Sequence, residues 1–86
     1  MSDIVQLRRW RGKPYGVIAL FVGIWYANGR CASYEHIGQH SEADHWHVIA
    51  HTRPVAADDP EAVELLAELR AIGYKPRVVQ RCPLRR

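Results

Sequence analysis

The sequence predicts a small α+β domain, in which an antiparallel β-sheet is covered by one main helix and one short helix. Two stretches carry this prediction. Tyr15–Tyr26 is the only long apolar run, and Pro60–Ile72 is amphipathic with clear signals at both ends. The chain has 86 residues, 48% of them hydrophobic and 24% charged, which is ordinary for one globular domain with a thin core. No repeat or linker divides it, so we expect a single domain over residues 1–86 with basic segments at both ends.

The apolar run Tyr15–Tyr26 is predicted to be the central strand of the sheet. Both of its alternate faces are apolar, whereas a strand with one wet face alternates apolar and polar residues. It must therefore be covered on both sides, by helices, by the terminal segments or by a second copy of the chain. Asn28-Gly29 follows it and favours a type I′ turn, which predicts a hairpin over residues 15–37. The second strand, Arg30–Ile37, is more polar and is expected nearer an edge.

The segment between this hairpin and the main helix allows two interpretations. Ser41 with Asp44 resembles a capping box, and Arg53-Pro54 gives an end, which predicts a short helix over about 41–51. One helical face then carries Ala43, Trp46, Ile49 and Ala50. Alternatively, His45–Thr52 alternates as a strand, with one face carrying Trp46, Val48 and Ala50. We favour the helix because the segment has both a start and a stop signal.

The main helix is predicted over Pro60–Ile72. Asp58-Asp59 provide an acidic cap, proline fits the first turn, and Gly73 is the glycine that ends the helix. Its apolar stripe is Val63, Leu65, Leu66, Leu69 and Ile72. Residues 74–82 then form a closing strand, and Ile4–Leu7 can add a short edge strand at the other end of the chain.

Composition also bounds location and chemistry. Two cysteines, Cys31 and Cys82, are too few for a disulfide framework; they lie on predicted strands and are able to pair, but we expect two reduced thiols. The start of the chain lacks the apolar segment of a signal peptide, and Tyr15–Tyr26 is shorter than the ~20 residues of a spanning helix. We therefore expect a cytoplasmic protein that does not cross a membrane. No catalytic motif of high specificity and no cofactor motif is present, so we expect no catalysis and no cofactor.

The net charge of +3 is unevenly distributed along the chain. Residues 1–13 and 74–86 are basic, whereas the middle is acidic. Near the start, an aromatic residue is interleaved with cations, as in proteins that bind single-stranded nucleic acid. If both ends lie together on the sheet, they form one basic surface for nucleic acid or protein, made of Arg8, Arg9, Trp10, Arg11, Lys13, Lys75, Arg77 and Arg81.

All five histidines fall within sixteen residues, 36–51. If 41–51 is helical, His47 and His51 are four residues apart, a spacing that lets two imidazoles share a metal ion. If the segment is a strand, the shared face carries His45, His47 and His51. The metalloprotease motif requires glutamate where Val48 stands, and no Cys-x-x-Cys pair is present. The sequence assigns no metal site and leaves His47 and His51 as candidates only.

The aromatic content points to a protein interface. Three tryptophans and four tyrosines exceed what a thin core needs, and Tyr, Trp and Arg dominate binding hot spots. We assign Trp25 and Trp46 to the core, and we expect Trp10, which stands among arginines, to be the exposed anchor. The strand with two apolar faces also makes a homodimer possible.

Three blocks resemble a pattern found in small uncharacterised proteobacterial proteins, many of them carried on phages and integrative elements: Gly38–Asp44, Thr52–Pro54 and Glu68–Tyr74. The resemblance covers about residues 34–81 and brings no functional residues with it. Some small phage and mobile-element proteins of this size act as anti-CRISPRs or other inhibitors of host defence by docking on a surface. The resemblance therefore implies a stoichiometric inhibitor of a bacterial protein or ribonucleoprotein complex. The alternatives are nucleic-acid binding through the basic ends and, third, metal binding by the histidine cluster.

Overall fold

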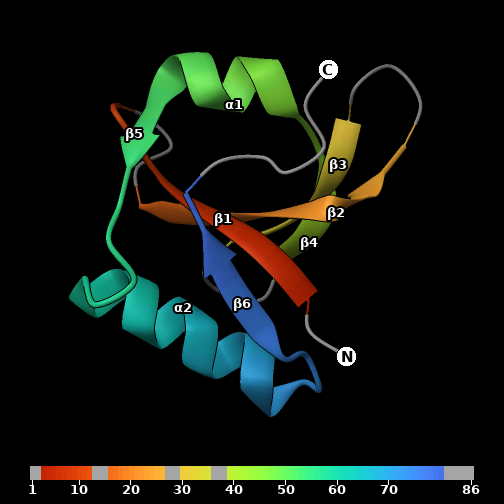
Figure 1. The fold of residues 1–86 in the computed structure, drawn as a ribbon. Helices are drawn as coiled ribbons and strands as arrows, with labels where there is room; N and C mark the ends of the chain where they lie inside the picture. Colours follow the sequence, from red (N-terminus) through yellow and green to blue (C-terminus); the bar gives the residue numbers. More distant parts are fainter. Residues whose placement is uncertain (1–2, 13–15, 27–29, 36–38, 81–86) are drawn as a thin grey trace.

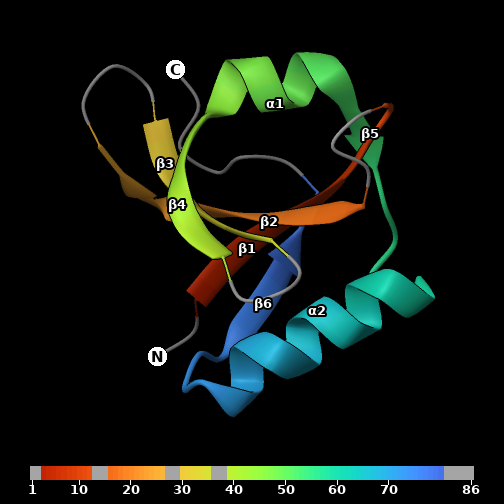
Figure 2. The same cartoon turned by 180° about the vertical axis from the view of Figure 1, so that it is seen from behind.

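A computed structural model describes residues 3–12, 16–26, 30–35 and 39–80. Within these residues it shows a curled six-stranded sheet with one helix against each face, which confirms the predicted α+β class (Figure 1). The strands are β1 (Asp3–Trp10), β2 (Val17–Trp25), β3 (Arg30–Glu35), β4 (Gln39–Asp44), β5 (Thr52–Pro54) and β6 (Pro76–Val79). The helices are α1 (His45–His51) and α2 (Pro60–Ala71). Figure 2 shows from behind that the two helices lie on opposite sides of the sheet.

The strand order is β4-β3-β2-β1-β5, and β6 also pairs with β1. β5 lies opposite Arg8–Trp10 and β6 opposite Asp3–Gln6, so these two short strands share one edge of β1 end to end. Among the described strands, every pair is antiparallel except β1 with β6. The exception arises because α2 carries the chain back along the sheet. The N–H of Asp3 donates to the carbonyl of Lys75 at 2.9 Å, so β6 starts beside the start of β1.

The predicted hairpin is confirmed by the antiparallel pairing of β2 with β3, while its turn, residues 27–29, lies outside the described residues. The N–H of Tyr26 donates to the carbonyl of Arg30 at 2.7 Å. β3 lies nearer an edge of the sheet than the central strand β2, as expected, and β4 pairs along its other side as the edge strand. β1 was expected as a short edge strand; instead it has eight residues and lies inside the sheet, since β2 pairs on one side and β5 and β6 on the other.

The segment that allowed two interpretations contains both a strand and a helix. Residues 39–44 form β4, and the helix begins at His45 instead of near Ser41. Asp44 is the N-cap, and its carboxylate accepts from the N–H of His47 at 3.2 Å. Antiparallel pairing with the preceding strand β3 supplies hydrogen bonds to the first half of the segment, and these outweigh the capping signal at Ser41.

Both faces of β2 are covered within the chain, as the sequence required. On the α2 side, the core contains Val17, Ala19 and Phe21 with Val5, Leu7, Leu65 and Leu69. On the α1 side, it contains Ile18, Leu20, Val22, Cys31 and Val48. Coverage stops after Val22, and Ile24 is 43% exposed. Cys82, the other cysteine, lies outside the described residues, as does the part of the predicted closing strand beyond Gln80.

Helix α2 is the element that sequence reasoning placed best. Asp59 is its N-cap, proline is at its first position, and Gly73 follows its end with a positive φ of 109°. The buried stripe differs slightly from the expected one: Ala62 joins it, whereas Val63 and Ile72 are exposed. Neither helix in the described residues is long and apolar enough to span a lipid bilayer.

Candidate binding surface on helix α1

Helix α1 turns one side to the sheet and the other to solvent. The inner side has the i, i+3, i+4, i+7 spacing of an amphipathic helix and consists of His45, Val48, Ile49 and Thr52. Val48 packs on the α1-side core formed by β2 and β3. The two ends of this inner side are polar, and each is held by a side chain from β1. These anchors fix the position of the helix on the sheet.

The first anchor joins His45 to Gln6. The amide nitrogen of Gln6 donates to the carbonyl of Gln80 at 3.0 Å, so its Oε1 is left to accept from Nε2 of His45 at 3.2 Å. Only 3% of the surface of His45 is exposed. This burial, and next the positive charge of Arg8, lower the pKa of His45, while Asp44 opposes the change. The imidazole is therefore neutral at neutral pH, with its proton on Nε2.

The second anchor is a pair of arginines at the C-terminal end of α1. Arg8 is 8% exposed, and its guanidinium group donates to Thr52 Oγ1 at 2.9 Å, to the Thr52 carbonyl at 3.0 Å and to the Ile49 carbonyl at 3.3 Å. Arg11 donates from Nε to the same Thr52 carbonyl at 3.3 Å. The last carbonyls of a helix lack intrahelical partners and carry a partial negative charge. Two cations therefore satisfy them and complement the helix dipole. Burial, followed by the charge of Arg11, lowers the pKa of Arg8.

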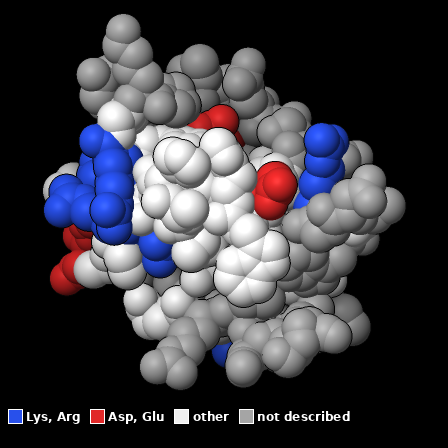
Figure 3. All heavy atoms as spheres, turned by 90° about the horizontal axis from the view of Figure 1, so that it is seen from above, with Lys and Arg blue, Asp and Glu red and all other residues white. Residues whose placement is uncertain are grey.

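The outer side of α1 is the candidate binding surface, which we call the α1 face and define as Trp46, His47, Ala50 and His51. All four are exposed, and Trp46 is 69% exposed. Arg11 borders the face, since its backbone N–H donates to the carbonyl of His51 at 3.1 Å. Figure 3 looks down on this side and shows a broad, mostly uncharged area with a group of basic side chains along one side and acidic side chains at its border. A large aromatic side chain in water on an anchored helix is typical of a binding hot spot.

The exposed tryptophan is not the one that the sequence was expected to expose. The indole N–H of Trp10 donates to the carboxylate of Glu35 at 2.9 Å, and its ring packs on the α1-side core. Trp46 was assigned to the core and is instead exposed, because a helix that begins at His45 turns it outward. The i, i+3, i+4, i+7 spacing of His45, Val48, Ile49 and Thr52 is the sequence signal that could have predicted the exposure of Trp46.

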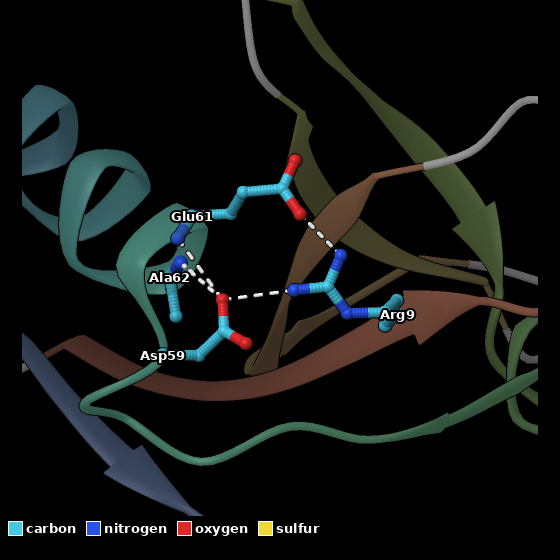
Figure 4. Close-up of polar contacts among 4 residues, drawn as sticks. All are labelled: Arg9, Asp59, Glu61 and Ala62. Carbon is cyan, nitrogen blue, oxygen red and sulfur yellow. Dashed lines mark hydrogen bonds and ion pairs between the residues drawn. The ribbon is translucent and has the colours of Figure 1, made fainter.

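Arg9, another member of the predicted basic surface, binds the first turn of α2. Its guanidinium group contacts the carboxylates of Asp59, at 2.8 Å, and of Glu61 (Figure 4). The same oxygen of Asp59 accepts from the N–H groups of Glu61 and Ala62 at 2.9 and 3.4 Å. Desolvation alone would raise the pKa of Asp59, but the hydrogen bonds from Arg9, Ala62 and Glu61 outweigh it, and the pKa is lowered. The charge of Arg9 is thus used to join β1 to α2.

The remaining members of the predicted basic surface are far apart or outside the description. Lys13 and Arg81 lie outside the described residues. Lys75 and Arg77 are exposed near the start of β1, where Arg77 pairs with Ile4, whereas Arg11 follows its end. Six residues of strand separate Ile4 from Trp10, about 20 Å at ~3.3 Å per residue. The exposed, described cations of the predicted basic surface therefore lie at opposite ends of β1: Lys75 and Arg77 near its start, and Arg11 after its end.

The histidines are also dispersed. His36 lies outside the described residues, His40 is in β4, and His45 is buried under α1. His47 and His51 are on the exposed side, with ring centroids 4.2 Å apart. No group of three or more metal-binding side chains occurs among the described residues. Comparison with protein-family models, with curated proteins and with solved structures finds no match for this chain.

Proposed function

We propose that this chain is a non-enzymatic binding protein that docks on another protein through the α1 face. The observation that carries the proposal is the exposure of Trp46 on a helix held at both ends. Burying an aromatic ring of this size on a partner is strongly favourable. Because Gln6, Arg8 and Arg11 already fix the helix, little conformational freedom remains to be lost on binding.

A protein partner fits the described surface better than nucleic acid does. Recognition of a phosphate backbone needs cations gathered on one face. In this chain Arg8 is buried beneath α1, Arg9 faces two carboxylates, and the indole of Trp10 is bonded to Glu35. The interleaved aromatic and basic pattern at the start of the chain therefore serves mainly to hold the fold together.

The chemistry of the α1 face defines the kind of partner. An apolar pocket on the partner would take the indole ring of Trp46, and acidic groups at its rim would face Arg11. The mostly uncharged area in Figure 3, with basic side chains along one side, matches such a surface. Charge at the rim governs the rate of association, whereas the buried aromatic ring governs the lifetime of the complex.

Capture from a nuclease-treated bacterial lysate tests the proposal. Wild type is compared with Trp46→Ala and with Val63→Ala, a matched control that shortens an exposed apolar side chain on α2. We expect one protein to be retained in a 1:1 complex by wild type and by Val63→Ala, and lost by Trp46→Ala. Arg11→Gln removes a rim charge and one hydrogen bond to Thr52, so it should slow association at low salt and also loosen the end of α1. Three capture results would overturn the proposal: the partner is still retained by Trp46→Ala, it is lost equally by Val63→Ala, or its retention requires nucleic acid. Light scattering that shows the chain associating with itself through Trp46 would also overturn it.

Docking on another protein is also the mode of action that the resemblance to small phage and mobile-element proteins implies. Stoichiometric docking is how a small inhibitor of a bacterial protein or ribonucleoprotein complex would work in the cytoplasm. The role of an inhibitor carried by a phage or another mobile element stays a prediction, and identification of the captured partner is its test.

A further inference from the structure

His47 and His51 form a pair of aligned imidazoles on the exposed side of α1. They are one helical turn apart, both are exposed, and their ring centroids are 4.2 Å apart with an interplanar angle of 31°. One tetrahedral metal ion bound by two imidazoles has metal–nitrogen distances of about 2.0–2.1 Å, which brings the two nitrogens to within about 3.4 Å of each other. Both side chains are exposed, so rotation about their side-chain bonds can bring the two nitrogens to this spacing.

The hydrogen bond of His51 prepares it as a metal ligand. Nδ1 of His51 lies 2.8 Å from the carbonyl oxygen of His47. A carbonyl can only accept, so Nδ1 carries the proton and the lone pair of His51 is on Nε2. Metal-ligating histidines commonly donate their other ring nitrogen to a backbone carbonyl in this way, which fixes the tautomer and the ring orientation. The helix backbone therefore supplies the supporting contact without a further side chain.

We propose that His47 and His51 bind one divalent transition-metal ion, with Cu²⁺ bound more tightly than Ni²⁺ or Zn²⁺. Imidazole nitrogen suits these three ions, and affinity for a given set of nitrogen ligands peaks at Cu²⁺. Two protein ligands leave coordination positions for water. No third histidine, cysteine or carboxylate among the described residues is grouped with this pair, so the two imidazoles are the protein donors of the site. This site lies within the α1 face, but metal binding by the free chain is tested without the docking partner.

The test is a titration of the full chain, without a metal-binding purification tag, with CuSO₄, NiCl₂ and ZnCl₂. Calorimetry measures the affinity, and quenching of tryptophan fluorescence by Cu²⁺ reports an ion bound close to Trp46, the neighbour of His47. We expect one ion per chain, in the order Cu²⁺ above Ni²⁺ and Zn²⁺. His47→Gln or His51→Gln should each weaken Cu²⁺ binding by about 100-fold, since the second imidazole otherwise binds within the same molecule.

A His36→Gln/His40→Gln variant is the matched control, because it removes two histidines and keeps the pair. It should bind Cu²⁺ like wild type. Circular dichroism without metal should be unchanged in His47→Gln and His51→Gln, since both side chains are exposed. Equal affinity in wild type and in the two single variants would overturn the proposal, and so would loss of binding in the control variant.

Discussion

Arg8 in β1 donates to both the hydroxyl and the carbonyl oxygen of Thr52, the residue that ends α1. The Thr52 hydroxyl in turn donates to the carbonyl of Val48 at 2.6 Å. One buried guanidinium group thus closes the end of a helix more than forty residues away in the sequence. A basic residue that looks like part of a binding surface in the sequence is a structural element of the fold.

Arg8→Met should destabilise the protein strongly. The apolar stem is kept, but the Ile49 carbonyl and the Thr52 hydroxyl lose the Arg8 donor, while the Thr52 carbonyl keeps only its bond from Arg11. A buried polar group left unsatisfied costs about 1–3 kcal/mol. We expect the free energy of unfolding to fall by about 2–4 kcal/mol in urea denaturation. Arg77→Met is the control, because Arg77 is exposed, and it should change stability by less than about 0.5 kcal/mol. Equal effects of the two substitutions would refute this role of Arg8.

Mild acid should weaken the fold through His45. Burial and the charge of Arg8 lower the pKa of His45 below its ordinary value of 6.5. Below that pH the unfolded chain binds a proton that the folded chain does not, so the contribution of His45 is complete above pH 6.5 and is lost as the pH falls toward the folded pKa. Urea midpoints measured from pH 7.5 to 5.5 should decrease. His45→Gln should flatten this decrease, and an unchanged slope in His45→Gln would count against the prediction.

Asp59→Ala should destabilise the protein more than Asp58→Ala. Both substitutions remove one acidic residue just before α2, but only Asp59 is known to cap the helix and pair with Arg9. The lowered pKa of Asp59 means that the folded state favours its charged form. Its contribution is therefore present above the ordinary value of 3.8 and is lost as the pH falls further. The difference in unfolding temperature between wild type and Asp59→Ala should therefore be smaller in acid. Thermal unfolding at pH 7 and below pH 3 measures this difference.

Tyr34→Phe should remove a link between the sheet and α2. The Tyr34 hydroxyl donates to the Glu68 carboxylate at 2.9 Å, and hydrogen bonds to charged groups are worth about 1.5–3 kcal/mol. Burial, followed by Glu68, raises the pKa of Tyr34 above 10.0, so its contribution is present below pH 10 and is lost as the pH rises through the folded pKa. Alkaline unfolding should be less steep in Tyr34→Phe. Glu68→Gln keeps an acceptor and should cost less; a larger loss would point to another role for Glu68.

The elements that the sequence predicted well are those whose signals are local. Helix α2 has a cap, a proline and a stop glycine within sixteen residues, and the hairpin has a turn signal between two strands. β2 could be predicted to be covered on both sides because the residues on both of its faces are apolar. In these cases the stabilising contacts either lie within the element or are implied by its composition.

What the sequence did not predict depends on contacts between separate elements of the fold. The boundary at Asp44 follows from pairing of β4 with β3, and the place of Trp46 follows from that boundary. The roles of Arg8 and Arg9 follow from partners contributed by α1 and α2. A charge pattern shows how many cations a segment has, but it does not show which of them the fold itself neutralises or buries.

The position of β1 has a consequence for how this protein is made. Among the six described strands it is synthesised first, yet β5 and β6, which fill its second edge, come from residues 52–79. Three side chains of β1 also bind groups that are synthesised later, at the end of α1, at the start of α2 and after β6: Arg8, Arg9 and Gln6. Pairings between such distant residues form slowly. The second edge of β1 therefore stays unpaired while the rest is synthesised, and the domain is expected to complete its folding in one late step.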